Sequence, residues 1–276
     1  MIFIDNISTG RFGNKLFHYN NLRQLANILN TNYYCVDFEN SNIFKDFSTP
    51  KSYGKIILKL NSETINSYGI DYIVEKSNIY HYQLDPCMGE LFFKLHSIDT
   101  KDVFKFKDRV KLSKDYCNSR AQVPFYNVAI HFRGNDFPGW FPGYNEYVDT
   151  DYYINSIDYV SENIKENKKY YLFTDDITDN SYKEIINYLE KNKINFELGS
   201  SNGNGNNYVD DFKKMSECDL IISSPSTFCI TAGFITKDKK IIHSKKWIDN
   251  RVEAEDTFWF DLVENNNSNY KIWKTV

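Results

Sequence analysis

Short apolar runs alternate with amphipathic segments from Val128 onward, and this is the clearest pattern in the sequence. The runs have the length of buried strands and lie at residues 128–132, 170–174, 195–198, 220–223 and 240–243. Between them, apolar positions at helical spacing predict helices, one through Tyr153, Ile157, Val160 and Ile164 and one through Tyr182, Ile185, Ile186 and Leu189. Strands that alternate with helices in this way predict a parallel sheet with helices on both faces.

The first residues show the same alternation over a shorter length. Residues 2–4 and 33–36 are apolar runs, and between them Leu22, Leu25, Ala26 and Leu29 fall at helical spacing. The N-terminal part therefore opens as a βαβ unit. From about residue 40 to 120, charges and turn residues interrupt every run, so no element is predicted there.

The expected domain boundary lies at residues 115–124, a polar stretch that ends in a proline just before the first strong strand. A chain of 276 residues is long enough for two modest domains. We predict two Rossmann-like α/β domains, residues 1–120 and residues 121–276.

The charge balance excludes one broad class of partner. The chain has 33 Lys and Arg against 37 Asp and Glu, a net charge of −4, so no global basic field is present to bind nucleic acid or an anionic membrane surface. An anionic ligand must therefore be bound by a local site.

The cysteines and the first residues indicate the compartment. The five cysteines are scattered and never form a Cys-x-x-Cys pair, which argues against a disulfide framework and a zinc site. The chain reaches Asp5 at once and lacks the basic start and long apolar run of a signal peptide, and no later window spans a bilayer. We expect a soluble cytoplasmic protein.

Ligands of open α/β sheets bind where loops leave the carboxyl ends of the strands. The first such loop, residues 10–15, reads Gly-Arg-Phe-Gly-Asn-Lys. Its glycines allow close approach of the backbone, and the helix start behind them favours negative charge. The loop lacks the adjacent Gly-Lys and the following Ser or Thr of a P-loop. It is either a ligand loop or a tight strand-to-helix turn.

A second loop follows the strongest strand, at residues 131–136, and reads His-Phe-Arg-Gly-Asn-Asp. The guanidinium of Arg133 can bind a diphosphate through two oxygens. Asp136 is a candidate base or a cap of the turn. His131 on an apolar strand is either a ligand-binding residue or a satisfied core histidine.

A third loop, residues 223–228, reads Ser-Ser-Pro-Ser-Thr-Phe and precedes a helix that we expect to start near Thr227. Hydroxyls and free amides at a helix start suit phosphate oxygens, although such residues also serve as ordinary N-caps. Residues 173–176 close another strand, and their acids either accept hydrogen bonds from a base or ribose or are solvated, as acidic loop tips usually are. Asp149 and Asp151 have the D-x-D form of some metal sites, but a helix follows them directly and an N-cap role explains them.

Taken together, these segments resemble the α-1,2-fucosyltransferases, glycosyltransferase family 11, and more distantly the protein O-fucosyltransferases and the α-1,6-fucosyltransferases. Residues 10–19 are similar to the family's opening G-G-L-G-N-Q-M-F-Q-Y, and residues 131–137 to its H-x-R-R-G-D-Y block, with one arginine here where the family has two. Residues 151–153 match its D-Y-Y, residues 173–176 its F-S-D-D, and residues 211–234 its last block, which includes S-S-F-S.

This resemblance implies a GT-B fold, with two Rossmann-like domains facing a cleft, and a GDP-fucose donor held mainly by the C-terminal domain. Arg133 would neutralise the diphosphate, and the amides or hydroxyls of Ser226, Thr227 and Phe228 would support it. His131 would read guanine.

The resemblance also implies roles outside the diphosphate. Asp175 would bind the ribose, Gly13 and Asn14 would line the donor from across the cleft, and Arg11 would lie near the acceptor. Asp136 is the candidate base. Inversion at the sugar would need no bound metal and no further cofactor.

The resulting hypothesis is an inverting, metal-independent fucosyltransferase that moves fucose from GDP-fucose to a glycan hydroxyl, with an α-1,2 linkage as the first candidate. Two alternatives stay open. The donor is another GDP-sugar such as GDP-rhamnose, or the protein is a catalytically inactive module that binds a nucleotide sugar or a glycan. The expected partners are thus a GDP-sugar donor and a glycan acceptor.

Overall fold

The structure is a computed structural model of the 276-residue chain. It describes residues 1–5, 7, 11–41, 56–60, 72–73, 75–76, 80–84, 125–134, 150–199, 207–234, 239–242 and 270–273. The chain separates into two compact units, Met1–Asp108 and Arg109–Val276, which we describe one at a time. The residues around either border lie outside the described ranges, so a boundary at residue 120 stays a prediction.

The first unit contains a parallel four-stranded sheet with the order β2-β1-β4-β3. Its strands are β1 (Ile2–Ile4), β2 (Tyr33–Cys35), β3 (Ile56–Leu60) and β4 (Tyr80–Leu84), and its long helix is α1 (Phe12–Ile28). The predicted βαβ opening is confirmed, and the helix begins well before the apolar positions from which it was predicted. Strands β3 and β4 fall in the part of the sequence for which no element was predicted.

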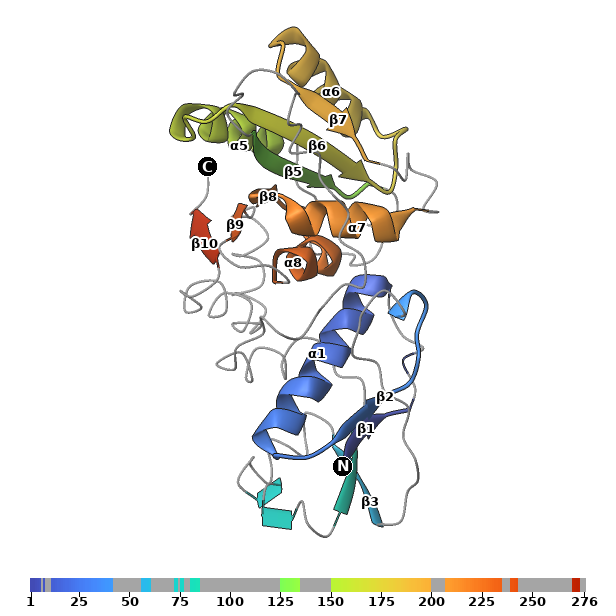
Figure 1. The fold of residues 1–276 in the computed structure, drawn as a ribbon. Coiled ribbons are helices and arrows are strands. Elements are labelled where there is room, and N and C mark those ends of the chain that lie inside the picture. Colours follow the sequence, from blue (N-terminus) through green and yellow to red (C-terminus); the bar gives the residue numbers. More distant parts are fainter. Residues whose placement is uncertain are drawn as a thin grey trace, which may run out of the picture. The chain divides into compact units, whose positions relative to one another are not determined.

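The second unit contains a parallel six-stranded sheet with the order β10-β9-β8-β5-β6-β7 (Figure 1). Its strands are β5 (Tyr126–Phe132), β6 (Lys168–Thr174), β7 (Phe196–Leu198), β8 (Leu220–Ile222), β9 (Lys239–Ile242) and β10 (Tyr270–Trp273). The five predicted strands are confirmed, and β10 is an addition. The order is that of the doubly wound dinucleotide-binding fold, in which the sheet grows in one direction and then in the other from its first strand.

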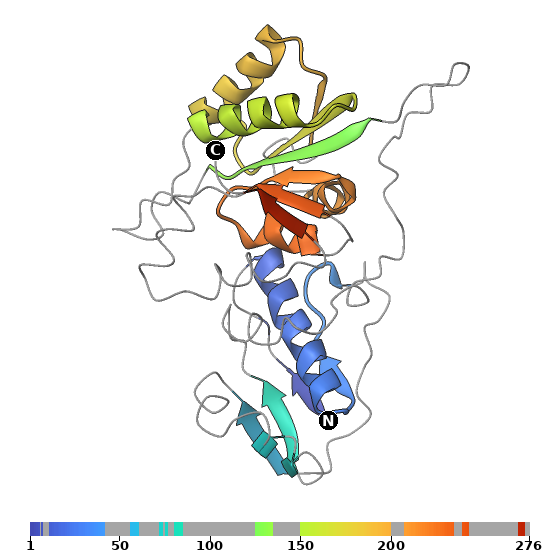
Figure 2. The same cartoon turned by 90° about the vertical axis from the view of Figure 1, so that its left-hand side faces the viewer.

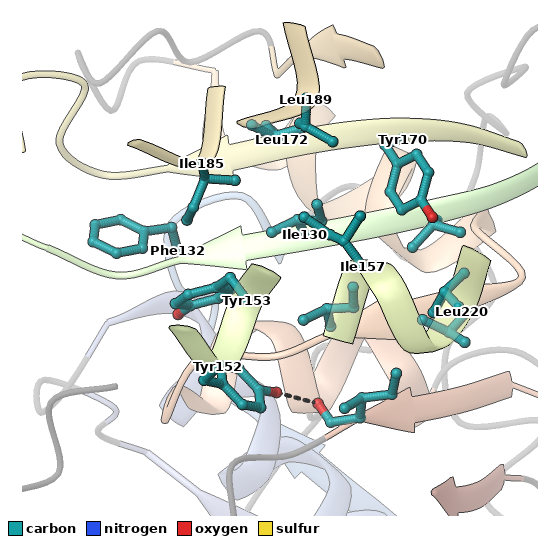
Figure 3. Close-up of a cluster of buried hydrophobic side chains, with 14 of the residues drawn as sticks. Ile130, Phe132, Tyr152, Tyr153, Ile157, Tyr170, Leu172, Ile185, Leu189 and Leu220 are labelled. Carbon is teal, nitrogen blue, oxygen red and sulfur yellow. Dashed lines mark hydrogen bonds between the residues drawn. The ribbon is translucent and has the colours of Figure 1, made fainter. Parts of the chain in front are cut away.

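Helices cover both faces of this second sheet (Figure 1, Figure 2). Helices α5 (Thr150–Asn163) and α6 (Asn180–Lys191) lie on one face, and α7 (Tyr208–Glu217) and α8 (Thr227–Phe234) lie on the other. The face under α5 and α6 forms one cluster of buried side chains, with Ile130, Leu172 and Ile222 from the strands and Ile157 and Ile185 from the helices (Figure 3). Both faces are covered because its strands are apolar on both sides.

Within the ranges that the structure describes, no helix has the length and apolar character needed to cross a membrane. The three cysteines in the described ranges, Cys35, Cys218 and Cys229, are buried thiols.

Candidate functional site

The strand order of the second unit reverses between β5 and β8, and open α/β sheets bind their ligands at this switch point. The two strands are direct neighbours, with Ile130 of β5 in register with Ile222 of β8. Because both strands run in the same direction, the residues that follow them emerge at the same edge of the sheet. Those residues are Arg133 after β5 and Ser223 after β8, so the second and third predicted loops start side by side.

A hydrogen bond joins the two strand ends across the switch point. Nδ1 of His131 lies 2.6 Å from Oγ of Ser224, and the two residues are only 7% and 1% exposed. The ring of Phe228, in the first turn of α8, packs against the imidazole with 5.5 Å between the ring centroids and 33° between the planes. Phe212 of α7 in turn packs edge-on against Phe228. The imidazole is therefore fixed by a polar contact and by an aromatic contact.

Charge at the switch point comes from Arg133. Burial is the main cause that lowers the pKa of His131 to about 3. The nearby positive charge of Arg133 contributes to this shift, and the carboxylate of Asp211 opposes it. Burial raises the pKa of Cys229 in α8 to about 12, and there too the charge of Arg133 acts, favouring the thiolate. The guanidinium thus acts on side chains of both β5 and α8, while His131 stays neutral at physiological pH.

The segment after β8 is held by hydrogen bonds along its whole length. Ser223 donates from its backbone N and from its hydroxyl to the carbonyl of Ile242, at 2.9 and 3.1 Å. The hydroxyl of Tyr152 donates to the carbonyl of Ser223 at 3.0 Å. The thiol of Cys229 donates to the carbonyls of Ser224 and Ser226 at 3.3 and 3.1 Å. These contacts fix the path of the chain into α8.

Ser226 is an N-cap of α8, because its Oγ accepts a hydrogen bond from the backbone N of Phe228 at 3.3 Å. The helix starts at Thr227, as predicted. The N-cap role that the sequence left open is therefore present. The amides of the first turn and the positive end of the helix dipole lie at the switch point, where they suit an anion.

Asp175 and Gly134 connect β5 to β6. The backbone N of Gly134 donates to Oδ1 of Asp175 at 3.0 Å. A Cβ on residue 134 would lie 3.2 Å from Cβ of Asp176 and 3.3 Å from the ring of Phe132. A larger residue at position 134 would therefore crowd Asp176 and Phe132, which is a packing reason for the glycine.

The remaining predicted residues belong to the first unit or lie outside the described ranges. Arg11 precedes α1 and is exposed, Gly13 is buried in the first turn, and Asn14 beside it is half-buried. Gly10 and the candidate base Asp136 lie outside the described residues, so their roles stay predictions.

The D-x-D segment leads into a helix. Thr150 begins α5, and Asp151 is exposed in its first turn, where the helix dipole stabilises a carboxylate. Asp149 lies outside the described residues. In the described parts of the chain, no three His, Cys, Asp or Glu side chains gather in a way that suits a metal ion.

Three residues at the switch point were not singled out from the sequence. Ser224 was one hydroxyl in a run of them, and its contact with β5 depends on the pairing of β5 with β8. Cys229 was considered only among the scattered cysteines that argue against a disulfide framework and a zinc site. Asp211 gave a usable signal, because an acidic residue there falls at helical spacing with Met215 on the apolar face of α7. The structure shows that it is only 3% exposed, which is unusual for an aspartate.

The sequence matches no family model, and no curated protein matches it significantly. The fold does match solved structures. A mutant of Arabidopsis thaliana FUT1 in complex with GDP matches with a TM-score of 0.54 and 11% identity, over 85% of this chain and 68% of that one. POFUT1 in complex with GDP-fucose matches with a TM-score of 0.47 and 11% identity, over 86% of this chain and 93% of that one. The two parallel sheets and the likeness to FUT1 confirm the predicted α/β fold of the GT-B type.

Proposed function

We propose that this protein is an inverting glycosyltransferase that moves fucose from GDP-fucose to a glycan hydroxyl, with the α-1,2 linkage as the first candidate. One observation carries the proposal: Arg133 and the N-terminus of α8 follow the two strands that flank the switch point. The ends of these strands are connected by the hydrogen bond between Nδ1 of His131 and Oγ of Ser224, at 2.6 Å. The sequence resemblance supplies the donor. The FUT1 structure of similar fold holds GDP, which supports the same choice.

In the proposed reaction, the acceptor oxygen forms a bond to the anomeric carbon while the bond from that carbon to the diphosphate breaks. The electron pair of the broken bond stays on the leaving GDP, and the acceptor proton passes to a base, for which Asp136 is the candidate. Arg133 and the first-turn amides of α8 stabilise the charge that develops on the diphosphate. Such prearranged donors commonly supply a large share of the rate enhancement.

Further contacts are proposed from the resemblance. His131 and Asp175 bind the guanosine of the donor, Gly13 and Asn14 contact the donor, and Arg11 contacts the acceptor. The reaction needs no bound metal.

Arg133→Ala tests the proposal. We expect turnover with GDP-fucose to fall about a hundredfold or more, as on loss of one oxyanion donor in other enzymes. The matched control is Lys191→Ala, which removes an exposed cation in the last turn of α6 and should keep wild-type turnover. Near-normal turnover of Arg133→Ala would show that this loop does not bind the diphosphate.

Nucleotide binding separates the proposal from its alternatives. GDP at a hundred times its dissociation constant should stabilise the wild-type protein by roughly 2.7 kcal/mol in a thermal unfolding assay, and UDP should not. Stabilisation by GDP with transfer from another GDP-sugar would reassign the donor. Stabilisation without transfer or hydrolysis of any GDP-sugar would identify a binding module, and no response to GDP would refute the proposal.

A further inference from the structure

The hydrogen bond between His131 and Ser224 has a direction that the surrounding contacts decide. A neutral imidazole carries its proton on one nitrogen only, so the bond runs either from Nδ1–H to the hydroxyl oxygen or from the hydroxyl to a bare Nδ1. The imidazole is neutral, because its pKa lies near 3. Each direction leaves Nε2 in a different state, so the question bears on what His131 offers to a ligand.

The hydroxyl of Ser224 is the group that settles the choice. It is buried, and its Oγ lies 2.6 Å from Nδ1 of His131. The side chain of Ser224 also interacts with the thiol of Cys229, whose sulfur is only a weak hydrogen-bond acceptor. If Nδ1 carried the proton, the hydroxyl would accept that bond, and its own proton would be left with the weakly accepting sulfur of Cys229. A buried hydroxyl with only a weak acceptor costs free energy, whereas a hydroxyl that donates to Nδ1 gives both groups a strong partner.

The backbone of Ser224 is fixed independently of this bond. The thiol of Cys229 donates to its carbonyl at 3.3 Å, and the preceding residue, Ser223, is bonded to Ile242 of β9. On the other side, the ring of Phe228 packs against the imidazole. The hydroxyl therefore meets Nδ1 from a rigid support, and the ring has little freedom to turn over.

We propose that Ser224 donates its hydroxyl proton to Nδ1 and thereby holds His131 as the Nε2–H tautomer, so that His131 presents a hydrogen-bond donor to the nucleotide. Ser224 is then a positioning residue that acts through His131. The ligand at Nε2 must offer an acceptor, such as a carbonyl oxygen or ring nitrogen of a base. The tautomer follows from the chain alone, whereas its use in nucleotide binding rests on the proposed function.

The tautomer is measured without any ligand. The full chain is labelled with ¹⁵N-histidine, and His131→Gln identifies the signals of His131 among those of the five histidines. At about pH 7 we expect a protonated Nε2 and an unprotonated Nδ1 in the wild type. A protonated Nδ1 would overturn the proposal.

Three variants test whether Ser224 sets this state. Ser224→Ala should produce a mixture of tautomers, and Ser224→Thr should keep the wild-type spectrum because it retains the hydroxyl. The matched control is Ser161→Ala, which removes an exposed serine hydroxyl of α5 that lies 3.4 Å from the hydroxyl of Tyr170. The control should leave the His131 signals unchanged. An unchanged His131 spectrum in Ser224→Ala would also overturn the proposal, since a purely structural serine would not alter the tautomer.

Binding of GDP is then measured by calorimetry on the same variants. Ser224→Ala should weaken GDP binding about fivefold, the effect expected for one net hydrogen bond, and Ser224→Thr should restore it. In the His131→Ala background, Ser224→Ala should add no further loss, because the two residues act as a unit. Additive losses would overturn the positioning role. If the wild type binds no GDP, the proposed function fails, while the labelled spectra still decide the tautomer.

Discussion

The burial of a neutral histidine at the switch point makes the stability of the protein depend on pH in a defined window. His131 has a pKa of about 3 in the folded protein, compared with an ordinary value of 6.5. The unfolded chain therefore binds a proton at His131 over a pH range in which the folded protein does not. Stability from this group is complete above pH 6.5 and is lost progressively as the pH falls toward 3.

The magnitude follows from the unfolded state. Between about pH 7.5 and pH 5.5, His131 changes in the unfolded chain from mostly neutral to mostly protonated, which lowers the free energy of unfolding by roughly 1 kcal/mol. His131→Gln and His131→Asn cannot bind this proton. The free energy of unfolding of each variant should therefore fall by about 1 kcal/mol less than that of the wild type over the same pH change. The wild type and both variants are compared by urea denaturation at the two pH values, followed by circular dichroism.

The comparison between proteins isolates His131, because every other titrating group is shared. Each variant can differ from the wild type in overall stability, and only the change between the two pH values is used. An equal pH dependence in the wild type and in both variants would mean that His131 has the same, ordinary pKa in the folded and the unfolded protein. The account of a neutral, buried imidazole would then be wrong.

Two further outcomes are expected. Tyr152→Phe removes a hydroxyl whose single proton is shared between the carbonyls of Ser223 and Ile242, at 3.0 and 2.8 Å. The free energy of unfolding should fall by about 1 kcal/mol in urea denaturation, and an unchanged value would mean that this hydroxyl does not fix the end of β8. Transfer from GDP-fucose should continue in excess chelator, and its loss would point back to Asp149 and Asp151 as metal ligands.

The sequence predicted the sheet of the second unit well because buried parallel strands carry unbroken apolar runs. Leu220-Ile221-Ile222 is such a run, and all three residues are fully buried. Strand β10, with the sequence Tyr-Lys-Ile-Trp, and strand β4, with Tyr-His-Tyr-Gln-Leu, mix polar and apolar residues. Their pairing with β9 and with β1 and β3 is a tertiary property that no local pattern contains.

The candidate site was predicted in its segments and not in its contacts. Loops after the strands identified His131, Arg133 and residues 223–228, since ligand-binding residues follow the carboxyl ends of parallel strands. Which loops become neighbours depends on the strand order. The contact between Ser224 and His131 therefore could not be predicted, because it depends on the pairing of β5 with β8.

That adjacency also has a consequence for how the candidate site forms during synthesis. His131 and Ser224 lie 93 positions apart in the chain, and contacts between distant segments form late because a long loop must first be closed. During synthesis, the ribosome must release β8 before β5 gains its second neighbour. A nascent or truncated chain that ends before β8 can still pair β5 with β6, yet it lacks half of the switch point. Under the proposed function, capture on immobilised GDP would report that β8 has taken its place beside β5.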